Sequence, residues 1–139
     1  MKKASFLLIL FAILFSCKSN SKKTEGEKQT YELTKESLRQ KEKKDPQNFL
    51  SVGGYNRHNI IGQMVIKGSI TNKASVASYK DVDIKLSFYS KTGTLLETDK
   101  ETVYEVIKPG ETKDFKTKYF APKGSDSVSF EVLTAKFVE

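Results

Sequence analysis

Residues 79–93 read YKDVDIKLSFYSKTG, and this stretch decides the fold. Its apolar side chains occupy alternate positions, at Val82, Ile84, Leu86 and Phe88. Because successive side chains of a strand point to opposite faces, the alternation predicts an antiparallel strand with one buried face. A turn follows at residues 91–93, where Gly93 is free to take a positive φ. We therefore expect this stretch to be the central strand of a small β domain.

Further extended segments lie on both sides of the central strand. They are residues 48–52, residues 63–71, residues 94–107, a run with Phe115, Thr117 and Tyr119 on one face, and a run that opens with Val128. Glycine and proline turns separate them, as at Gly53-Gly54 and Pro109-Gly110. Several short strands with closely spaced turns predict a single all-β domain, an antiparallel sandwich over residues 48–139.

Three places interrupt the alternation and predict local irregularities. Gly68 falls on the inward face of its segment, which indicates a bulge or a close approach by another backbone. Residues 94–107 alternate poorly, so we expect a bend or bulge among them. After Val132 the apolar residues change parity, which fits either a bulge near Val132 or a tail packed from both sides.

The N-terminus has the pattern of an export signal. Lys2 and Lys3 precede an apolar run from Phe6 to Phe15, which is shorter than the ~20 residues that a bilayer-spanning helix needs. Residues 14–17, LFSC, resemble the lipobox of bacterial lipoproteins. The resemblance implies that the signal peptide is residues 1–16 and that Cys17 carries acyl chains through a thioether. The alternative is a free or buried cysteine, although a lone cysteine in an exported chain has no internal disulfide partner.

Residues 17–47 are predicted to connect the lipid to the β domain. Residues 18–27 have no large apolar side chain, so we expect a flexible basic tether. A short helix is predicted from Thr34 to Lys44, with Thr34 as its cap and Asp45-Pro46 at its end. The lysines of its last turn either contact anionic head groups or form a solvated helix end, and the thin apolar stripe favours the second interpretation.

Length and charge limit the classes of function. With 139 residues and 37% apolar content, the chain has room for one folded domain. The formal charge is +7, but residues 60–139 hold twelve basic and eleven acidic side chains, so the β domain is predicted to be nearly neutral. A nucleic-acid reader carries positive charge on its folded face. The sequence therefore argues against nucleic acid as a partner.

A set of short motifs extends along residues 46–138. They are NFL at 48–50, IGQ at 61–63, GSITNKA at 68–74, YKDV at 79–82, FYSKTG at 88–93, KPG at 108–110 and APK at 121–123. Together they resemble a family of Bacteroidota lipoproteins and, more distantly, FxLYD-type immunoglobulin-like domains. The resemblance implies an immunoglobulin-like β-sandwich in the cell envelope. It supplies no catalytic or ligand-binding residues.

Few residues are arranged for catalysis or metal binding. His58 is the only histidine. Any Ser-His-Asp arrangement would therefore have to include it, and no second histidine could join it on a metal ion. Asp81 and Asp83 share a face, and Glu97, Asp99 and Glu101 are expected on the neighbouring strand. Ca²⁺ requires six to eight converging oxygens, and the interleaved lysines favour cross-strand ion pairs instead. We expect no cofactor, no metal and no enzymatic activity.

The candidate recognition site is the loop predicted after the first strand. It contains Tyr55, Arg57 and His58, and tyrosine and arginine are common anchors in protein interfaces. The alternative is an ordinary surface loop, because a loop histidine without a partner is usually a plain surface residue.

The sequence thus predicts a membrane-anchored envelope lipoprotein with a non-enzymatic interaction or accessory module. Its partner is expected to be an envelope protein that docks on a strand edge or a loop tip. The alternative function is binding of a glycan or another small ligand. Lysines rather than acidic residues follow Cys17, which by the resemblance favours the periplasmic side of the outer membrane. The inner membrane and the cell surface stay open.

Overall fold

The computed structural model describes residues 21–138. The predicted signal peptide, Cys17 and residues 18–20 lie outside this range. The described chain begins with the helix α1 (Ser21–Lys44) and the 3-10 turn η1 (Pro46–Asn48). Six strands follow: β1 (Leu50–His58), β2 (Met64–Asn72), β3 (Ser78–Ser90), β4 (Leu95–Val103), β5 (Thr112–Tyr119) and β6 (Ser125–Val138).

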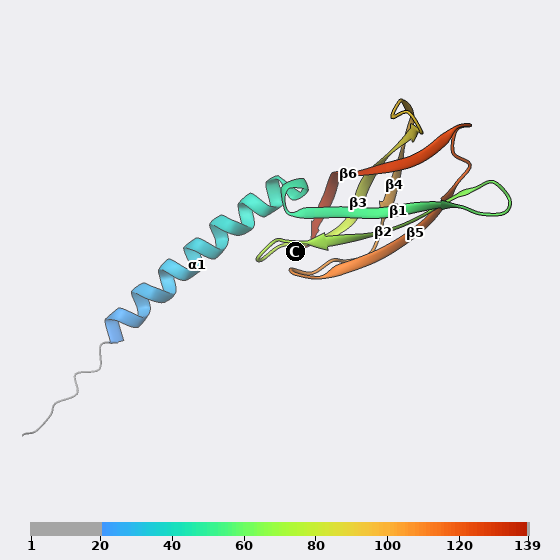
Figure 1. Cartoon of the computed structure of the whole chain (residues 1–139). Coiled ribbons are helices and arrows are strands. Elements are labelled where there is room, and N and C mark those ends of the chain that lie inside the picture. The colour runs from blue at the N-terminus through green and yellow to red at the C-terminus, as the bar shows by residue number, and fades with distance from the viewer. Residues whose placement is uncertain (1–20, 139) are drawn as a thin grey trace, which may run out of the picture.

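The strands form two antiparallel sheets of three strands each, with the orders β1-β2-β5 and β4-β3-β6. The sheets pack face to face, and α1 projects from one end of the sandwich (Figure 1). Strands A-B-E and C′-C-F of immunoglobulin domains have the same order. The prediction of an all-β, immunoglobulin-like sandwich is confirmed.

The strand predicted to organise the domain is β3, in the middle of its sheet. Its inward side chains are fully or almost fully buried and form one cluster with those of β2: Val82, Ile84, Leu86 and Phe88 from β3, and Met64, Ile66 and Ile70 from β2. Each large apolar side chain buried in this way contributes about 1.5–3 kcal/mol. The two central strands therefore supply much of the energy that holds the sheets together.

Gly68 marks a close approach between strands rather than a bulge. The register Gly54–Gly68–Phe115 continues without a shift across the β1-β2-β5 sheet. A Cβ on Gly68 would lie 2.5 Å from the Phe115 ring, and one on Gly54 would lie 2.4 Å from the carbonyl oxygen of Lys67. Neither position has room for a side chain. Of the two alternatives predicted for Gly68, the close approach is the correct one.

The other predicted irregularities are also present. Thr134 pairs with Asp83 and Val132 with Ile84, so Leu133 is an extra residue and β6 has its bulge next to Val132. The register between β3 and β4 shifts near the start of β4. β4 ends at Val103, short of the predicted boundary, and Ile107 makes only an isolated bridge.

The prediction that the first strand ends at Gly53-Gly54 was wrong. β1 continues to His58 and pairs with β2 along its whole length, so residues 55–58 belong to a strand and not to a loop. Glycine weakens an isolated strand, but at Gly54 the backbone of β2 occupies the space that a side chain would fill. The actual loop between β1 and β2 comprises residues 59–63.

The helix is longer than predicted, because α1 begins at Ser21 instead of Thr34. The described part of the segment expected to be flexible is therefore helical. Lys, Glu and Gln have good helix propensity, and Gln40 donates a 2.7 Å hydrogen bond to Glu36 one turn earlier. Thr34 caps no helix end: its hydroxyl donates to the carbonyl oxygen of Thr30 within the helix.

Glu42 fixes the C-terminal end of α1 to the sandwich. Its side chain is buried, and its carboxylate accepts hydrogen bonds from the backbone N–H groups of Ser75, Val76 and Ala77 at 2.7, 3.0 and 2.7 Å. The Tyr79 hydroxyl donates a 2.8 Å hydrogen bond to the Glu42 carbonyl oxygen. Hydrogen bonds to a charged acceptor are stronger than those between neutral groups. One glutamate therefore orders both the helix end and the loop before β3.

Further contacts at this helix end involve β6 and β3. The Arg39 guanidinium and the Lys43 ammonium lie 5.1 and 5.2 Å from the centre of the Phe137 ring, within the range of cation–π attraction. Burial, together with the negative charge of Glu42, raises the pKa of Tyr79 to about 12. The hydroxyl is therefore protonated at neutral pH and donates to the helix.

Asn72 holds the crossover between the two sheets. Its side chain is completely buried, and its Nδ2 donates to the carbonyl oxygens of Ala77 and Ile107 at 2.8 and 3.0 Å. Its Oδ1 accepts a 2.9 Å hydrogen bond from the N–H of Ala74. Buried polar groups are costly unless they are bonded. The hydrogen bonds of Asn72 satisfy its own buried amide group and three backbone groups.

Candidate functional site

The structure separates the three predicted recognition residues. Tyr55 and Arg57 lie on the outer face of the β1-β2-β5 sheet, whereas His58 has the opposite parity at the end of β1. Tyr55 pairs with Lys67, and Lys67 pairs with Lys116 of β5. In the next row, Val65 lies between Arg57 and Lys118. We call this surface the basic face and define it by Tyr55, Arg57, Lys67, Lys116 and Lys118.

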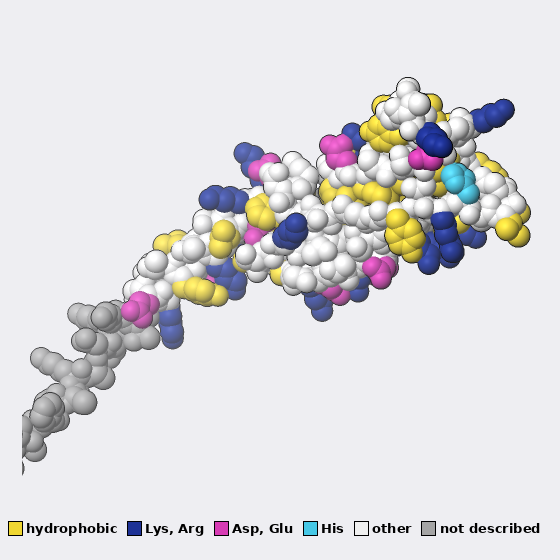
Figure 2. Space-filling model, in the orientation of Figure 1, with side chains coloured by type: hydrophobic (Ala, Val, Ile, Leu, Met, Phe, Trp, Pro, Cys, Tyr) yellow, Lys and Arg dark blue, Asp and Glu magenta, His cyan; other side chains and the backbone are white. Residues whose placement is uncertain are grey.

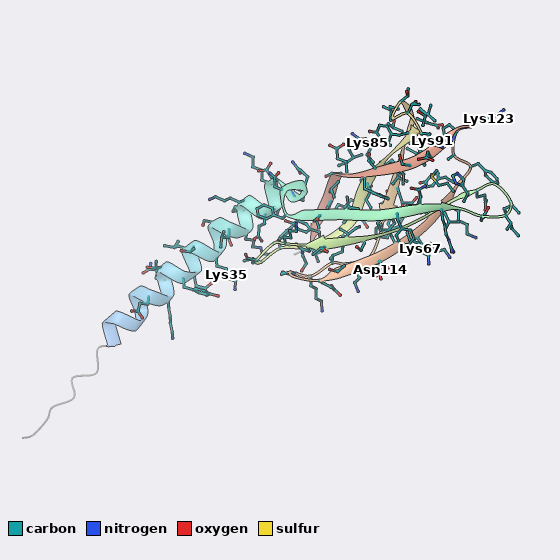
Figure 3. The ribbon with its side chains drawn as sticks, viewed as in Figure 1. Lys35, Lys67, Lys85, Lys91, Asp114 and Lys123 are labelled. Carbon is teal, nitrogen blue, oxygen red and sulfur yellow. The ribbon has the colours of Figure 1, made fainter. Side chains whose placement is uncertain are left out.

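A hollow of about 560 Å³ lies on the basic face. It forms above Gly53, which faces outward and has no side chain. Its lining is Gly53, Gly54, Tyr55, Lys67, Gly68, Ser69, Asp114, Phe115 and Lys116. The Tyr55 residue is 59% exposed. Lys67 and Asp114 project from the same side of the molecule (Figure 3). An exposed aromatic ring thus stands beside ammonium, hydroxyl and carboxylate groups.

The cations of the basic face have no anionic partners within residues 21–138, where Arg57, Lys67, Lys116 and Lys118 form no ion pair. The β4-β3-β6 sheet differs, because Lys85 pairs with Glu131, Lys100 with Asp83 at 3.2 Å and Lys136 with Asp81 at 2.9 Å. Positive charge is therefore concentrated on one sheet, although the domain as a whole is nearly neutral.

The loop between β1 and β2, residues 59–63, lies at the end of the sandwich farthest from α1 (Figure 1). We call it the distal loop. Ile60 is fully exposed and Ile61 is 66% exposed. Tyr119 of β5 pairs with Met64 at the start of β2. Phe120 follows Tyr119 and so lies at the same end, where it is 79% exposed. Hydrophobic side chains reach this end of the surface beside a group of Lys and Arg side chains (Figure 2).

The distal loop is held in one conformation by Asn59. Its Oδ1 accepts hydrogen bonds from the N–H groups of Ile61 and Gln63 at 3.1 and 2.9 Å, and its Nδ2 donates to the Gln63 side chain. The N–H of Gly62 bonds the Asn59 carbonyl oxygen, and Gly62 has a φ of +80°, which glycine adopts without strain. The loop therefore satisfies its own polar groups and presents the isoleucines outward.

The acidic residues considered for calcium lie on two faces. Asp83 faces outward and accepts hydrogen bonds from Thr102 and Lys100, which lower its pKa, that from Thr102 most. Glu101 pairs with inward-facing Ile84 and accepts hydrogen bonds from Thr117 and Tyr119 at 3.2 and 2.6 Å. Glu97, Asp99 and Glu101 lie on β4, the strand next to β3, as predicted. Lys100 and Asp83 form the cross-strand ion pair that the sequence predicted.

Within the part of the chain that the structure describes, no group of three or more His, Cys, Asp or Glu residues is placed to hold a metal ion. None of the described helices has the length and apolar character required to span a membrane. Comparisons of the chain with protein-family models, with curated proteins and with solved structures found no match. The lipoprotein resemblance therefore stays a prediction.

Two groups of residues were missed from the sequence. Lys116 and Lys118 alternate with the inward Phe115, Thr117 and Tyr119, so a period-2 reading of β5 places both lysines outward together. That signal was available, but the position of Lys67 beside them depends on strand order. Glu42 gave no local signal, because it lies among lysines in a polar helix and its partners are more than 30 residues away.

Proposed function

We propose that the chain is an envelope lipoprotein that positions a non-enzymatic interaction module. In this proposal Cys17 carries the lipid in the outer membrane and the protein faces the periplasm. The helix α1 acts as a stalk, and its fixed attachment at Glu42 directs the distal loop away from the anchor. The sandwich then presents that loop to a protein partner.

The observation that carries the proposal is the apolar surface formed by Ile60, Ile61 and Phe120. Exposed apolar residues that cluster at one site are typical of interaction surfaces. Asn59 holds the loop in place before any partner arrives, which reduces the ordering cost of association. Arg57 and Lys118 lie one row inside this end. The surface therefore suits a partner whose docking site is apolar at its centre and acidic at its rim.

Membrane attachment is tested with Cys17→Ala in the native host, with Ser19→Ala as the matched control. We expect the Cys17 variant to leave the membrane fraction after an alkaline wash and the control to stay. A lipid with two or three acyl chains holds a protein firmly, at ~0.8 kcal/mol for each buried CH₂. Retention of the Cys17→Ala protein in the membrane would refute the lipid anchor.

The distal loop is tested by replacing Ile61 with a photoreactive amino acid, with the same replacement at exposed Lys91 as the control. We expect one envelope protein to crosslink at position 61 but not at position 91. Ile60→Asp in the same chain should abolish that product, and the purified partner should bind the wild type more weakly as salt increases. Equal crosslinking at both positions, or no effect of Ile60→Asp, would contradict a docking site on the loop.

A further inference from the structure

We propose that the basic face is a second binding site and that its ligand is an acidic polysaccharide. A sugar ring lies on Tyr55, and the anionic groups of the polymer bind Lys67 and Lys116. The site is separate from the distal loop. This proposal rests on the proposed function in one respect, the export of the protein to the cell envelope. The geometry of the site does not depend on the lipid.

The charge arrangement is the first reason. Lys67 and Lys116 are direct cross-strand neighbours, and like charges placed directly opposite one another destabilise a sheet. Among the described residues no carboxylate pairs with either of them. The outer face of the other sheet pairs its lysines with acidic residues, so the fold has no general need for free cations. An anion bound between Lys67 and Lys116 would neutralise the repulsion between their ammonium groups.

The shape of the surface is the second reason. The hollow of about 560 Å³ has the size of a small-ligand site. On the outer face it is open above Gly53, where a Cβ would meet no atom within 4 Å. The exposed Tyr55 ring forms one side and offers an apolar face with a polar tip. Ser69 and Asp114 supply a hydroxyl and a carboxylate that bond the hydroxyl groups of a sugar.

The extension of the positive charge indicates a polymer rather than a single anion. Arg57 and Lys118 lie in the row after Tyr55, Lys67 and Lys116. Rows on one face of a sheet are about 7 Å apart, since two residues of a strand separate them. A chain with negative charges along its length meets cations in both rows. A neutral glycan leaves all four cations unpaired, and the proposal therefore specifies an acidic one.

The experiment measures binding of polygalacturonate to the full-length chain in detergent micelles, with neutral dextran as the reference polymer. We expect polygalacturonate to bind, and its affinity to fall as salt increases. The double variant Lys67→Gln/Lys116→Gln should bind about tenfold more weakly, as should Tyr55→Ala. The matched control is Lys91→Gln/Lys123→Gln, which removes the same charge from exposed lysines outside the basic face and should change affinity less than about twofold.

Several results would overturn the proposal. They are absence of polygalacturonate binding, an equal loss in the Lys91/Lys123 control, no effect of Tyr55→Ala, or tighter binding of a single-stranded oligonucleotide or of phosphatidylglycerol vesicles. Unfolding midpoints in urea establish that each variant is folded. Because binding is measured without the native membrane, failure here leaves the Cys17 and Ile61 results unaffected, and failure of those leaves this result unaffected.

Discussion

At the end of the sandwich next to α1, polar side chains are buried and fully bonded, whereas at the opposite end apolar side chains are exposed to water. Glu42 and Asn72 represent the first arrangement, and Ile60, Ile61 and Phe120 the second. Bonded polar groups in a protein interior fix geometry, and their loss is costly. Exposed apolar groups add little to stability. The end near α1 is thus fixed by its hydrogen bonds, and the distal end is the part that we propose binds a partner.

Of the substitutions that test this contrast, Asn72→Ala is expected to lower stability most. The substitution removes the side-chain partner of the Ala77 carbonyl and of the Ala74 N–H, while the Ile107 carbonyl keeps only its hydrogen bond from the Tyr79 N–H. We expect a loss of about 2–4 kcal/mol in the free energy of unfolding. Urea denaturation measures it. The control is Asn56→Ala, which removes one exposed hydrogen bond to the Asp126 carbonyl oxygen and should cost less than about 1 kcal/mol. Equal losses would show that burial at this end has no special role.

Glu42→Ala is expected to have the next largest effect, a loss of about 2 kcal/mol. The three N–H groups of residues 75–77 lose their acceptor, but release of α1 exposes them to water and limits the cost. Trypsin should then cleave faster near Lys43 and Lys44. The control is Glu36→Ala, which lies on the exposed part of the same helix and should change stability by less than about 0.5 kcal/mol. Unchanged cleavage in the Glu42 variant would contradict the assigned attachment.

The alkaline stability of the protein tests the Tyr79 hydrogen bond. An unfolded tyrosine loses its proton near pH 10, whereas burial holds the pKa of Tyr79 at about 12 in the fold. Above pH 10 the unfolded state is thus favoured progressively, and stability falls as the pH rises from 10 to 12. Burial and the Glu101 hydrogen bond raise the pKa of Tyr119 in the same direction.

The variant Tyr79→Phe separates the two tyrosines. It should lose about 1 kcal/mol at pH 7, where the hydroxyl bonds the helix end. Between pH 10 and pH 12 its stability should decline less steeply than that of the wild type, because the contribution of Tyr79 is gone. Tyr119 still contributes, as do Lys113 and Lys136, whose pKa values are raised by their hydrogen bonds to Glu111 and Asp81. Urea midpoints measured at intervals of half a pH unit give both slopes. Identical slopes would exclude Tyr79 as a source of the decline.

The smallest effect is expected at the distal end, from Ile60→Ser and Ile61→Ser. Both side chains are exposed, so stability should change by less than about 0.5 kcal/mol. By contrast, Ile70→Ser in the core should cost more than about 3 kcal/mol, as it buries a hydroxyl and leaves a cavity. A large loss at Ile60 would mean that the distal loop serves the fold and is not reserved for a partner.

The sandwich could be predicted because its core strands follow a local rule. Alternation along residues 79–93 identified β3, and the change of parity after Val132 located the bulge in β6. Gly53-Gly54 was misread because the close approach between β1 and β2 is a tertiary feature that no local pattern reports. The start of α1 was missed because its polar residues gave an expectation of flexibility, although the same residues favour a helix.

The candidate site was only partly predictable. Tyr55 and Arg57 were selected as contact residues, but in a loop with His58, and the strand register places them with lysines from two other strands instead. The near-neutral charge of residues 60–139 concealed the basic face, since a sum over the domain cannot show that the outer face of one sheet pairs its lysines and the outer face of the other does not. That separation becomes visible only when strand order and register are known.

The attachment of α1 through its C-terminal end alone also has a consequence for how the protein responds to mechanical load. The helix between Ser21 and Glu42 is about 30 Å long at ~1.5 Å per residue, whereas its contacts from Arg39 to Lys43 extend over only about 6 Å. A sideways pull at the Ser21 end is therefore amplified at the junction. We therefore expect the hydrogen bonds of Glu42 to break before either sheet opens, so that the domain turns as a unit about this junction.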